Sequence, residues 1–146
     1  MGQGSIIGYD LSEEGCQISY YNEAQHEPET VKNESGEYQI PLVIGCKNDA
    51  WYIGEEARSH AKHKDGAMAT DLLAKSMHGA KIHLGRRTYD AVWLLAKFIR
   101  LTLQQFDKIE SIVFCVPEMS PDIARMLRGI GCLLYTSPSP RDTERS

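Results

Sequence analysis

The sequence predicts an α/β fold built on a mixed sheet, and three features of the chain indicate it. Near the N-terminus, residues 5–10 and 17–21 are short apolar runs separated by a polar turn, as in two paired strands. Residues 88–106 carry apolar side chains at spacings of three and four, which is typical of a largely buried helix. Residues 111–116 follow as a continuous run rich in β-branched residues, which predicts a central parallel strand covered on both faces.

The segments between these three features complete the predicted element order. Residues 22–37 are polar and acid-rich, and we interpret them as a solvated connection. Residues 40–46 predict a third strand, antiparallel to the first two, and residues 50–53 its hairpin partner. A helix is expected to begin at Gly54. Near the end of the chain, Ser-Pro-Asp at 120–122 places good N-cap and first-turn residues at the start of a last helix.

Composition and charge narrow the classes of function. The chain has 146 residues, and its 16 basic and 20 acidic side chains give a net charge of −4 without a basic block. We therefore expect neither a nucleic acid nor a membrane surface as a partner. No apolar run approaches the roughly 20 residues of a spanning helix. Cys16, Cys46 and Cys115 lack paired spacing, which indicates reduced thiols and a cytoplasmic protein.

The C-terminal segment is interpreted separately from the rest of the chain. Residues 132–142, Cys-Leu-Leu-Tyr-Thr-Ser-Pro-Ser-Pro-Arg-Asp, resemble a translated sequencing adapter. We accordingly expect residues 1–131 to be one native lobe and residues 132–146 to be a non-native, disordered tail. On this interpretation the natural domain breaks off after Gly131 and the chain is a fragment. A Ser/Pro-rich interaction linker is the alternative.

The candidate functional residues lie where the first predicted strand ends. A carboxylate at Asp10 can hold a hydrated Mg²⁺, which prefers oxygen ligands and keeps several waters. The backbone N–H groups of the turn Ser12, Glu13, Glu14 and Gly15 can face phosphate oxygens. We therefore expect Asp10 to bind metal through water and the turn to bind a nucleotide. The structural alternative is that Asp10 caps the turn with its own side chain.

This opening resembles the first phosphate loop of the superfamily that joins actin, the seventy-kilodalton heat-shock chaperones and sugar kinases. Gly8 and Asp10 match the loop pattern Gly-x-Asp-x-Gly-Thr-Thr, whereas Ser12, Glu13 and Glu14 stand in place of Gly-Thr-Thr. Two later stretches resemble the chaperone lobe in the same order, through Pro41, Val43, Gly54 and Ala57 and then through Val116, Pro117 and Arg125. The resemblance implies an incomplete ribonuclease-H-like ATPase lobe, with a mixed sheet, helices on both faces and its second lobe missing.

The same resemblance suggests a catalytic lysine. The stretch around Ala74, Lys75 and Gly79 resembles a chaperone segment whose lysine reaches the phosphates. It implies that Lys75 would act with Asp10 in phosphoryl transfer, with ATP and Mg²⁺ as cofactors. A solvated surface lysine is the alternative.

Glu13 and Glu14 leave two functions open. A carboxylate ~4 Å from a phosphate charge is repelled by ~1 kcal/mol in water and by ~4 kcal/mol in a partly screened site. Either the loop is reshaped around ATP, in which case we expect this chain alone to be an inactive part of an ATPase, or it does not bind ATP. In the second case the chain is a degenerate, non-hydrolysing lobe of the kind seen in bacterial proteins of unknown function, and serves as a scaffold for a protein partner.

Overall fold

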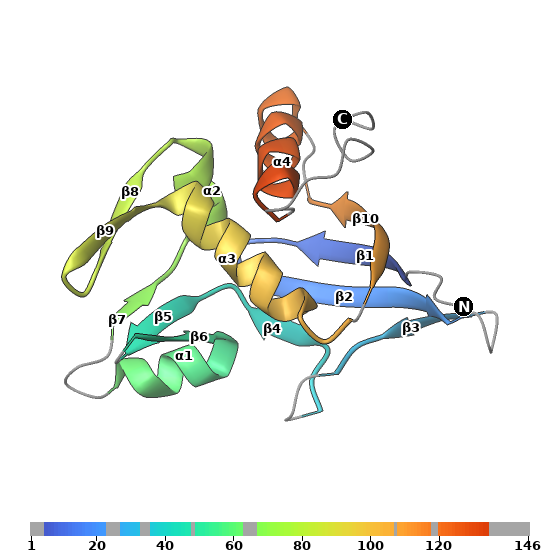
Figure 1. Ribbon diagram of the computed structural model, residues 1–146, viewed down its shortest axis with the longest axis horizontal. Helices are drawn as coiled ribbons and strands as arrows, with labels where there is room; N and C mark the ends of the chain where they lie inside the picture. Colours follow the sequence, from blue (N-terminus) through green and yellow to red (C-terminus); the bar gives the residue numbers. More distant parts are fainter. Residues whose placement is uncertain are drawn as a thin grey trace.

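The computed structural model describes residues 5–22, 27–32, 36–47, 49–62, 67–106, 108–117 and 120–134. The elements in chain order are β1 Ser5–Leu11, β2 Gly15–Asn22, β3 Glu27–Thr30, β4 Gln39–Pro41, β5 Ile44–Lys47, β6 Ala50–Ile53, α1 Gly54–Ala61, β7 Ala67–Ala69, α2 Leu72–Met77, β8 Lys81–Leu84, β9 Arg87–Asp90, α3 Ala91–Leu103, β10 Ile109–Cys115 and α4 Pro121–Leu134. Helix α3 crosses the main sheet, with α4 beside it (Figure 1). No helix in the described ranges is long and apolar enough to span a membrane.

The main sheet is mixed and contains five strands. Its order is β10-β1-β2-β3, and β4 also pairs with β2. Strand β1 is antiparallel to β2 and parallel to β10, with Asp10 opposite both Gln17 and Cys115. The parallel pairing of the first and last strands, linked through α3, confirms the α/β class and the mixed sheet that the sequence predicts.

Strand β10 differs from its prediction because it is an edge strand. Among the described strands it pairs with β1 alone. Its side chains alternate: Ile112 and Phe114 are half-buried, whereas Val113 is 55% exposed. The prediction of a strand covered on both faces is wrong, because a run of apolar β-branched residues does not reveal how many faces are covered.

The helices that contact the main sheet cover one of its faces. Ile7 and Tyr9 of β1 point to that face and are fully buried. Their neighbour Ile6 points to the opposite face and is 48% exposed, and Asp10 and Val113 are exposed on the same face. Helices on both faces are therefore not found in the described part of the chain, and the predicted architecture needs this correction.

The core lies between the covered face and α3. The Thr102 hydroxyl donates to the Ile99 carbonyl at 2.6 Å, so the buried Tyr9 hydroxyl acts as donor to Thr102 Oγ1 at 2.8 Å. The Tyr20 ring meets Phe106 edge-on, with centroids 5.6 Å apart. The side chains of α3 buried against this face are Leu94, Leu95, Phe98, Ile99 and Leu103. The predicted apolar helix is thus confirmed as core.

Several predicted boundaries shift, each because a strand pairs elsewhere. Helix α3 begins at Ala91 rather than at residue 88, since β9 pairs with β8 in a hairpin. The predicted third strand at 40–46 is two strands: β4 ends at Pro41 beside β2, and β5 pairs with β6 and β7. The predicted connection at 22–37 contains β3.

Helix α4 begins as predicted and extends past the predicted end of the lobe. The Ser120 Oγ accepts a hydrogen bond from the Ile123 N–H at 3.2 Å, which confirms its role as N-cap. The helix continues beyond Gly131 to Leu134. Residues 135–146 lie outside the described residues, so the disordered tail remains a prediction there.

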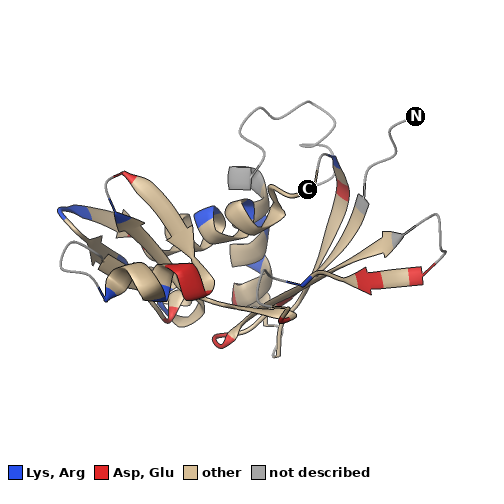
Figure 2. Cartoon of the chain, turned by 90° about the horizontal axis from the view of Figure 1, so that it is seen from below, with Lys and Arg blue, Asp and Glu red and all other residues tan. Residues whose placement is uncertain are grey.

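The two ends of the molecule differ in their charged side chains. Strands β8 and β9 lie at one end, together with α1 and the small sheet of β5, β6 and β7 (Figure 1). This hairpin contributes Lys81, Arg86 and Arg87, whereas β3 at the other end contributes Glu27 and Glu29. Figure 2 shows blue tips at the hairpin end, where the start of α1 is red because it carries Glu55 and Glu56, and the acidic strand at the other end. The net charge of −4 is therefore unevenly distributed over the fold.

Candidate functional site

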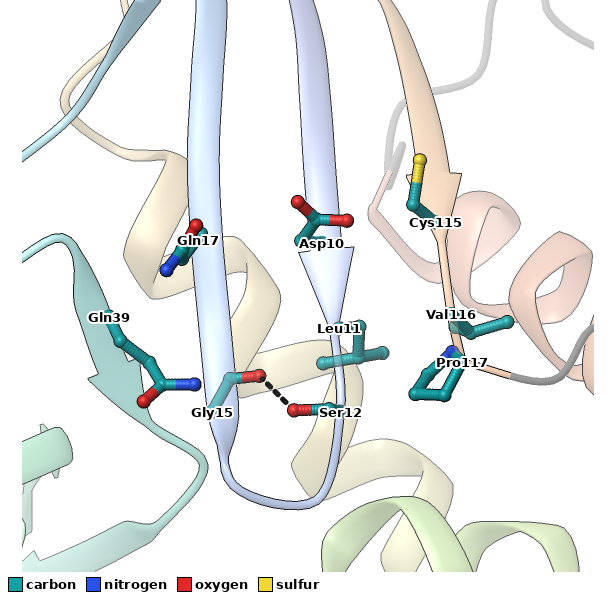
Figure 3. A pocket seen from close by; sticks show the side chains of 9 residues that line it. All are labelled: Asp10, Leu11, Ser12, Gly15, Gln17, Gln39, Cys115, Val116 and Pro117. Atoms are coloured by element: carbon teal, nitrogen blue, oxygen red, sulfur yellow. Dashed lines mark hydrogen bonds between the residues drawn. The ribbon is translucent and has the colours of Figure 1, made fainter.

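An open depression of about 310 Å³ lies where β1 and β10 end (Figure 3). Its lining comes from the ends of these two strands, from the turn after β1, and from β2 and β4: Asp10, Leu11, Ser12, Gly15, Gln17, Gln39, Cys115, Val116 and Pro117. Because β1 and β10 are parallel neighbours, the segments that follow them meet at one edge of the sheet. The structure thus brings Asp10, Ser12 and Gly15 together, while Glu118 lies outside the described residues.

Asp10 occupies the exposed side of this depression. Its carboxylate lies between Gln17 and Cys115, its two cross-strand neighbours (Figure 3). It forms no hydrogen bond or ion pair with another described residue, and the turn is closed by the Ser12 hydroxyl, which donates to the Gly15 carbonyl at 3.2 Å. Asp10 therefore does not cap the turn, and its oxygens face solvent, where a hydrated cation can approach. Within the described ranges, no group of three or more His, Cys, Asp or Glu side chains gathers to hold a metal.

Some backbone amides of the turn between β1 and β2 form hydrogen bonds within the turn itself. The Ser12 N–H donates to the Gly15 carbonyl at 2.9 Å, and the Gly15 N–H donates to the Ser12 carbonyl at 3.2 Å. Glu13 and Glu14 form the two-residue loop between them. Two of the four backbone amides that the sequence assigns to phosphate binding are therefore engaged inside the turn.

Gly15 is required by the sheet rather than by a ligand. A Cβ at this position would overlap the carbonyl oxygen of Ile40, because β4 approaches the backbone of β2 closely there. Ser12, Glu13 and Glu14 do not adopt positive φ, so the replacement of glycine by serine at position 12 brings no backbone strain. The loop is thus a polar hairpin turn that needs no glycine at positions 12–14.

Glu13 has an unexpected partner in helix α2. The residue before this helix, Asp71, has a φ of 55° and makes no side-chain cap. In its place, Glu13 Oε1 accepts the Leu73 N–H at 3.0 Å and Glu13 Oε2 accepts the Ala74 N–H at 3.1 Å. A carboxylate on the first free amides of a helix satisfies orphan donors and complements the helix dipole. Glu13 therefore joins the β1–β2 turn to α2.

Lys75 follows these capped amides on α2 but does not reach the depression. Its side chain is half-buried, and it is not among the residues that line the space beside Asp10. Glu14 is exposed on the turn and also does not line it. Asp10 is therefore the one charged residue among the described residues of the lining.

The sequence did not point to several residues of this depression. Gln17, Gln39 and Cys115 line it because they lie beside Asp10 or one strand further along the sheet. Strand alternation from Asp10 gives a signal for Gln17 once the hairpin is predicted. No comparable signal exists for Gln39 or Cys115, because their places depend on the registers of strands far away in the chain.

Comparison with known proteins gives one family. Residues 27–136 match the family described as "Family of unknown function (DUF5716) C-terminal". The match covers well over half of the chain; it includes Gln39 and the end of β10, whereas Asp10 and the acidic turn precede it. No curated protein matches the chain.

Proposed function

This chain belongs to the C-terminal family of DUF5716, whose description assigns no activity, and we propose that it is a protein-interaction scaffold built on an actin- or chaperone-like lobe that does not hydrolyse ATP. One observation carries the proposal: the Ser12 and Gly15 amides are engaged inside the turn, and the Glu13 carboxylate binds the backbone of α2, so the turn serves as a link within the fold.

The charges around the depression also favour a scaffold. Its described lining residues include Asp10 but no Lys or Arg, and Lys75 lies on α2 outside the lining. A phosphate ~4 Å from a carboxylate at this surface adds repulsion of ~1 to ~4 kcal/mol. Described residues of this chain supply no opposite charge at the depression to offset this repulsion.

The proposed lobe rests on topology and on the order of the motifs. A β-hairpin followed by a parallel last strand, with a crossing helix between them, is compatible with the first half of such a lobe. A sheet by itself implies no function, so the proposal depends on the turn and its charges.

Calorimetry with ATP tests the proposal on the whole chain. We expect a Kd weaker than about 1 mM with and without Mg²⁺, because the lining lacks a cation. No phosphate release above background is expected either. Binding below about 100 µM that requires Mg²⁺, together with phosphate release that Asp10→Asn abolishes, would refute the scaffold role. The Glu14→Gln variant serves as the control for loss of one negative charge on the same turn.

Binding of a Mg²⁺–nucleotide without turnover is a second candidate, because Asp10 and Pro117 line one depression at the ends of parallel strands. Amide chemical shifts recorded during a titration with Mg²⁺–ATP test this candidate. It requires shifts confined to Asp10, Gly15 and Val116 that disappear in Asp10→Asn. If the shifts are absent or scattered, nucleotide binding is rejected and the scaffold role remains.

A further inference from the structure

A cluster of aromatic and basic side chains lies at the end of the molecule opposite β3. We call it the aromatic–basic patch and define it by Trp51 of β6, Arg87 and Tyr89 of β9, and Trp93 and Lys97 of α3. It lies away from the strand ends that form the depression, and none of its members lines that depression.

The three rings of the patch touch one another. Tyr89 and Trp93 are stacked, with centroids 5.2 Å apart and an interplanar angle of 16°. Trp51 meets Tyr89 edge-on at 5.5 Å and lies tilted against Trp93 at 5.7 Å. These contacts hold the rings in place before any partner arrives, so their side-chain entropy is already lost in the free chain.

One cation lies over a ring of the patch, and a second lies on the same strand as Tyr89. Lys97 Nζ lies 5.7 Å from the centroid of the Trp51 ring, one helical turn after Trp93. Arg87 is exposed and precedes Tyr89 by two residues, which puts both on the same face of β9. Neither cation forms a salt bridge with a described residue, since the ion pairs found there involve Arg58 and Arg125.

Packing explains only part of this arrangement. Trp51 and Tyr89 are half-buried and join the small sheet to α3, which accounts for their aromatic side chains. Trp93 is 41% exposed, although it is a large apolar residue on the solvent side of a helix. Exposed Trp with neighbouring Tyr and Arg is the composition of binding hot spots, in which preorganised rings bury area at low entropic cost.

We propose that the aromatic–basic patch is a docking site for an acidic peptide segment of a partner protein, one that carries an aromatic or leucine anchor among Asp and Glu residues. The inference rests on the proposed scaffold role and names its surface and its partner. Charge complementarity with Arg87 and Lys97 selects an acidic partner. A peptide fits better than a nucleic acid, because two cations beside three rings match a few carboxylates around one apolar anchor, whereas a nucleic acid needs a basic stripe, which this chain of net charge −4 lacks.

A random dodecapeptide library displayed on phage tests the proposal with the whole chain as bait. We expect the selected peptides to share acidic residues around one aromatic or leucine. Fluorescence polarisation with the strongest synthetic peptide then measures affinity for variants whose fold is checked by circular dichroism. Trp93→Ala and Lys97→Glu should each weaken binding at least tenfold, whereas Arg128→Glu, a charge reversal at an exposed position of α4, should not.

Three results would overturn the proposal. One is a selection that yields no acidic peptides, and another is a peptide that binds Lys97→Glu as well as the unchanged chain. The third is tighter binding of the patch to a labelled single-stranded DNA 12-mer or to a second copy of the chain, measured with the same variants. If ATP binding stays absent in these cases, the scaffold role survives and only this surface is rejected.

Discussion

Glu13 and Tyr9 illustrate how single side chains join segments that are far apart in the sequence. Glu13 lies next to a candidate phosphate position, yet its carboxylate binds amides of α2 about 60 residues later. Tyr9 of β1 donates to Thr102 of α3 across the buried face of the sheet. Both contacts connect the first hairpin to the helical layer, so both should contribute to stability.

Replacing Glu13 by Gln should destabilise the chain by about 1 kcal/mol, because an amide oxygen replaces a charged group that accepts two hydrogen bonds at a helix start. Urea unfolding followed by circular dichroism measures the change. Glu14→Gln on the same turn is the matched control, and we expect a change below about 0.5 kcal/mol for it. Equal effects of the two variants would mean that the contacts with α2 do not stabilise the fold.

Replacing Tyr9 by Phe should cost about 1 kcal/mol, since it removes one buried hydrogen bond and leaves the ring in place. Thr102→Ser keeps the hydroxyl acceptor, so the cost of Tyr9→Phe should persist in that background. Tyr20→Phe is a suitable control, because its hydroxyl donates to Glu29 near the surface and should matter less. If Tyr20→Phe lowers the free energy of unfolding as much as Tyr9→Phe does, the buried Tyr9–Thr102 hydrogen bond is not the stronger contribution.

At the scale of elements, sequence periodicity identifies the hairpin, the crossing helix and the last strand, but not their neighbours. The apolar spacing in α3 reports burial on the sheet, which is why it predicts a core helix. Strands β8 and β9 are four residues each and are followed at once by α3, so the end of β9 is hard to distinguish from the beginning of the helix. Whether a short segment such as β4 forms a strand depends on the strand it pairs with more than on its own residues.

Replacing Gly15 and Gly129 by alanine should change the free energy of unfolding in opposite directions. Gly15→Ala places a methyl group against the Ile40 carbonyl and should lower the free energy of unfolding by about 1–3 kcal/mol. Gly129 lies inside α4, and a methyl group there would meet no atom within 4 Å outside the backbone of its own helix. Gly129→Ala should therefore raise the free energy of unfolding by about 0.5–1 kcal/mol. Thermal unfolding of the two variants tests this, and a stabilising Gly15→Ala would mean that β4 does not pack as described.

At the scale of the whole molecule, stability should decrease in alkaline solution. Burial raises the pKa of the Cys16 thiol to about 11 from its ordinary value of 9.0, and burial also raises the pKa of the neighbouring Tyr9 hydroxyl. The unfolded chain then loses the Cys16 proton above pH 9, whereas the folded chain keeps it up to about pH 11. The free energy of unfolding therefore falls with rising pH in this window, by at most about 1.4 kcal/mol per pH unit for one such group.

Urea unfolding at several values between pH 8 and pH 11 measures this slope. The Cys16→Ala variant should show a shallower decrease than the unchanged chain, whatever its stability at neutral pH. Identical slopes for the two proteins would contradict a protonated, buried thiol at Cys16.

The candidate site was predictable only where it depends on local sequence. Asp10 and the turn follow from a strand, a short polar break and a second strand, all within a few residues. The role of Glu13 and the placement of Lys75 depend on where α2 packs, which neighbouring residues do not encode. The same holds for Cys115, whose position beside Asp10 is a property of the β1–β10 register.

That register also has a consequence for the order of events during protein synthesis. Ser5 pairs with Ile109 and Asp10 with Cys115. The parallel pairing of β1 with β10 therefore cannot form until about a hundred further residues have been translated. At about 5–20 residues per second the wait lasts roughly 5–20 seconds, during which β1 has β2 on one side and an open hydrogen-bonding edge on the other. During this interval, a chaperone or a neighbouring nascent chain can contact the ribosome-bound chain at the edge of β1 that later pairs with β10.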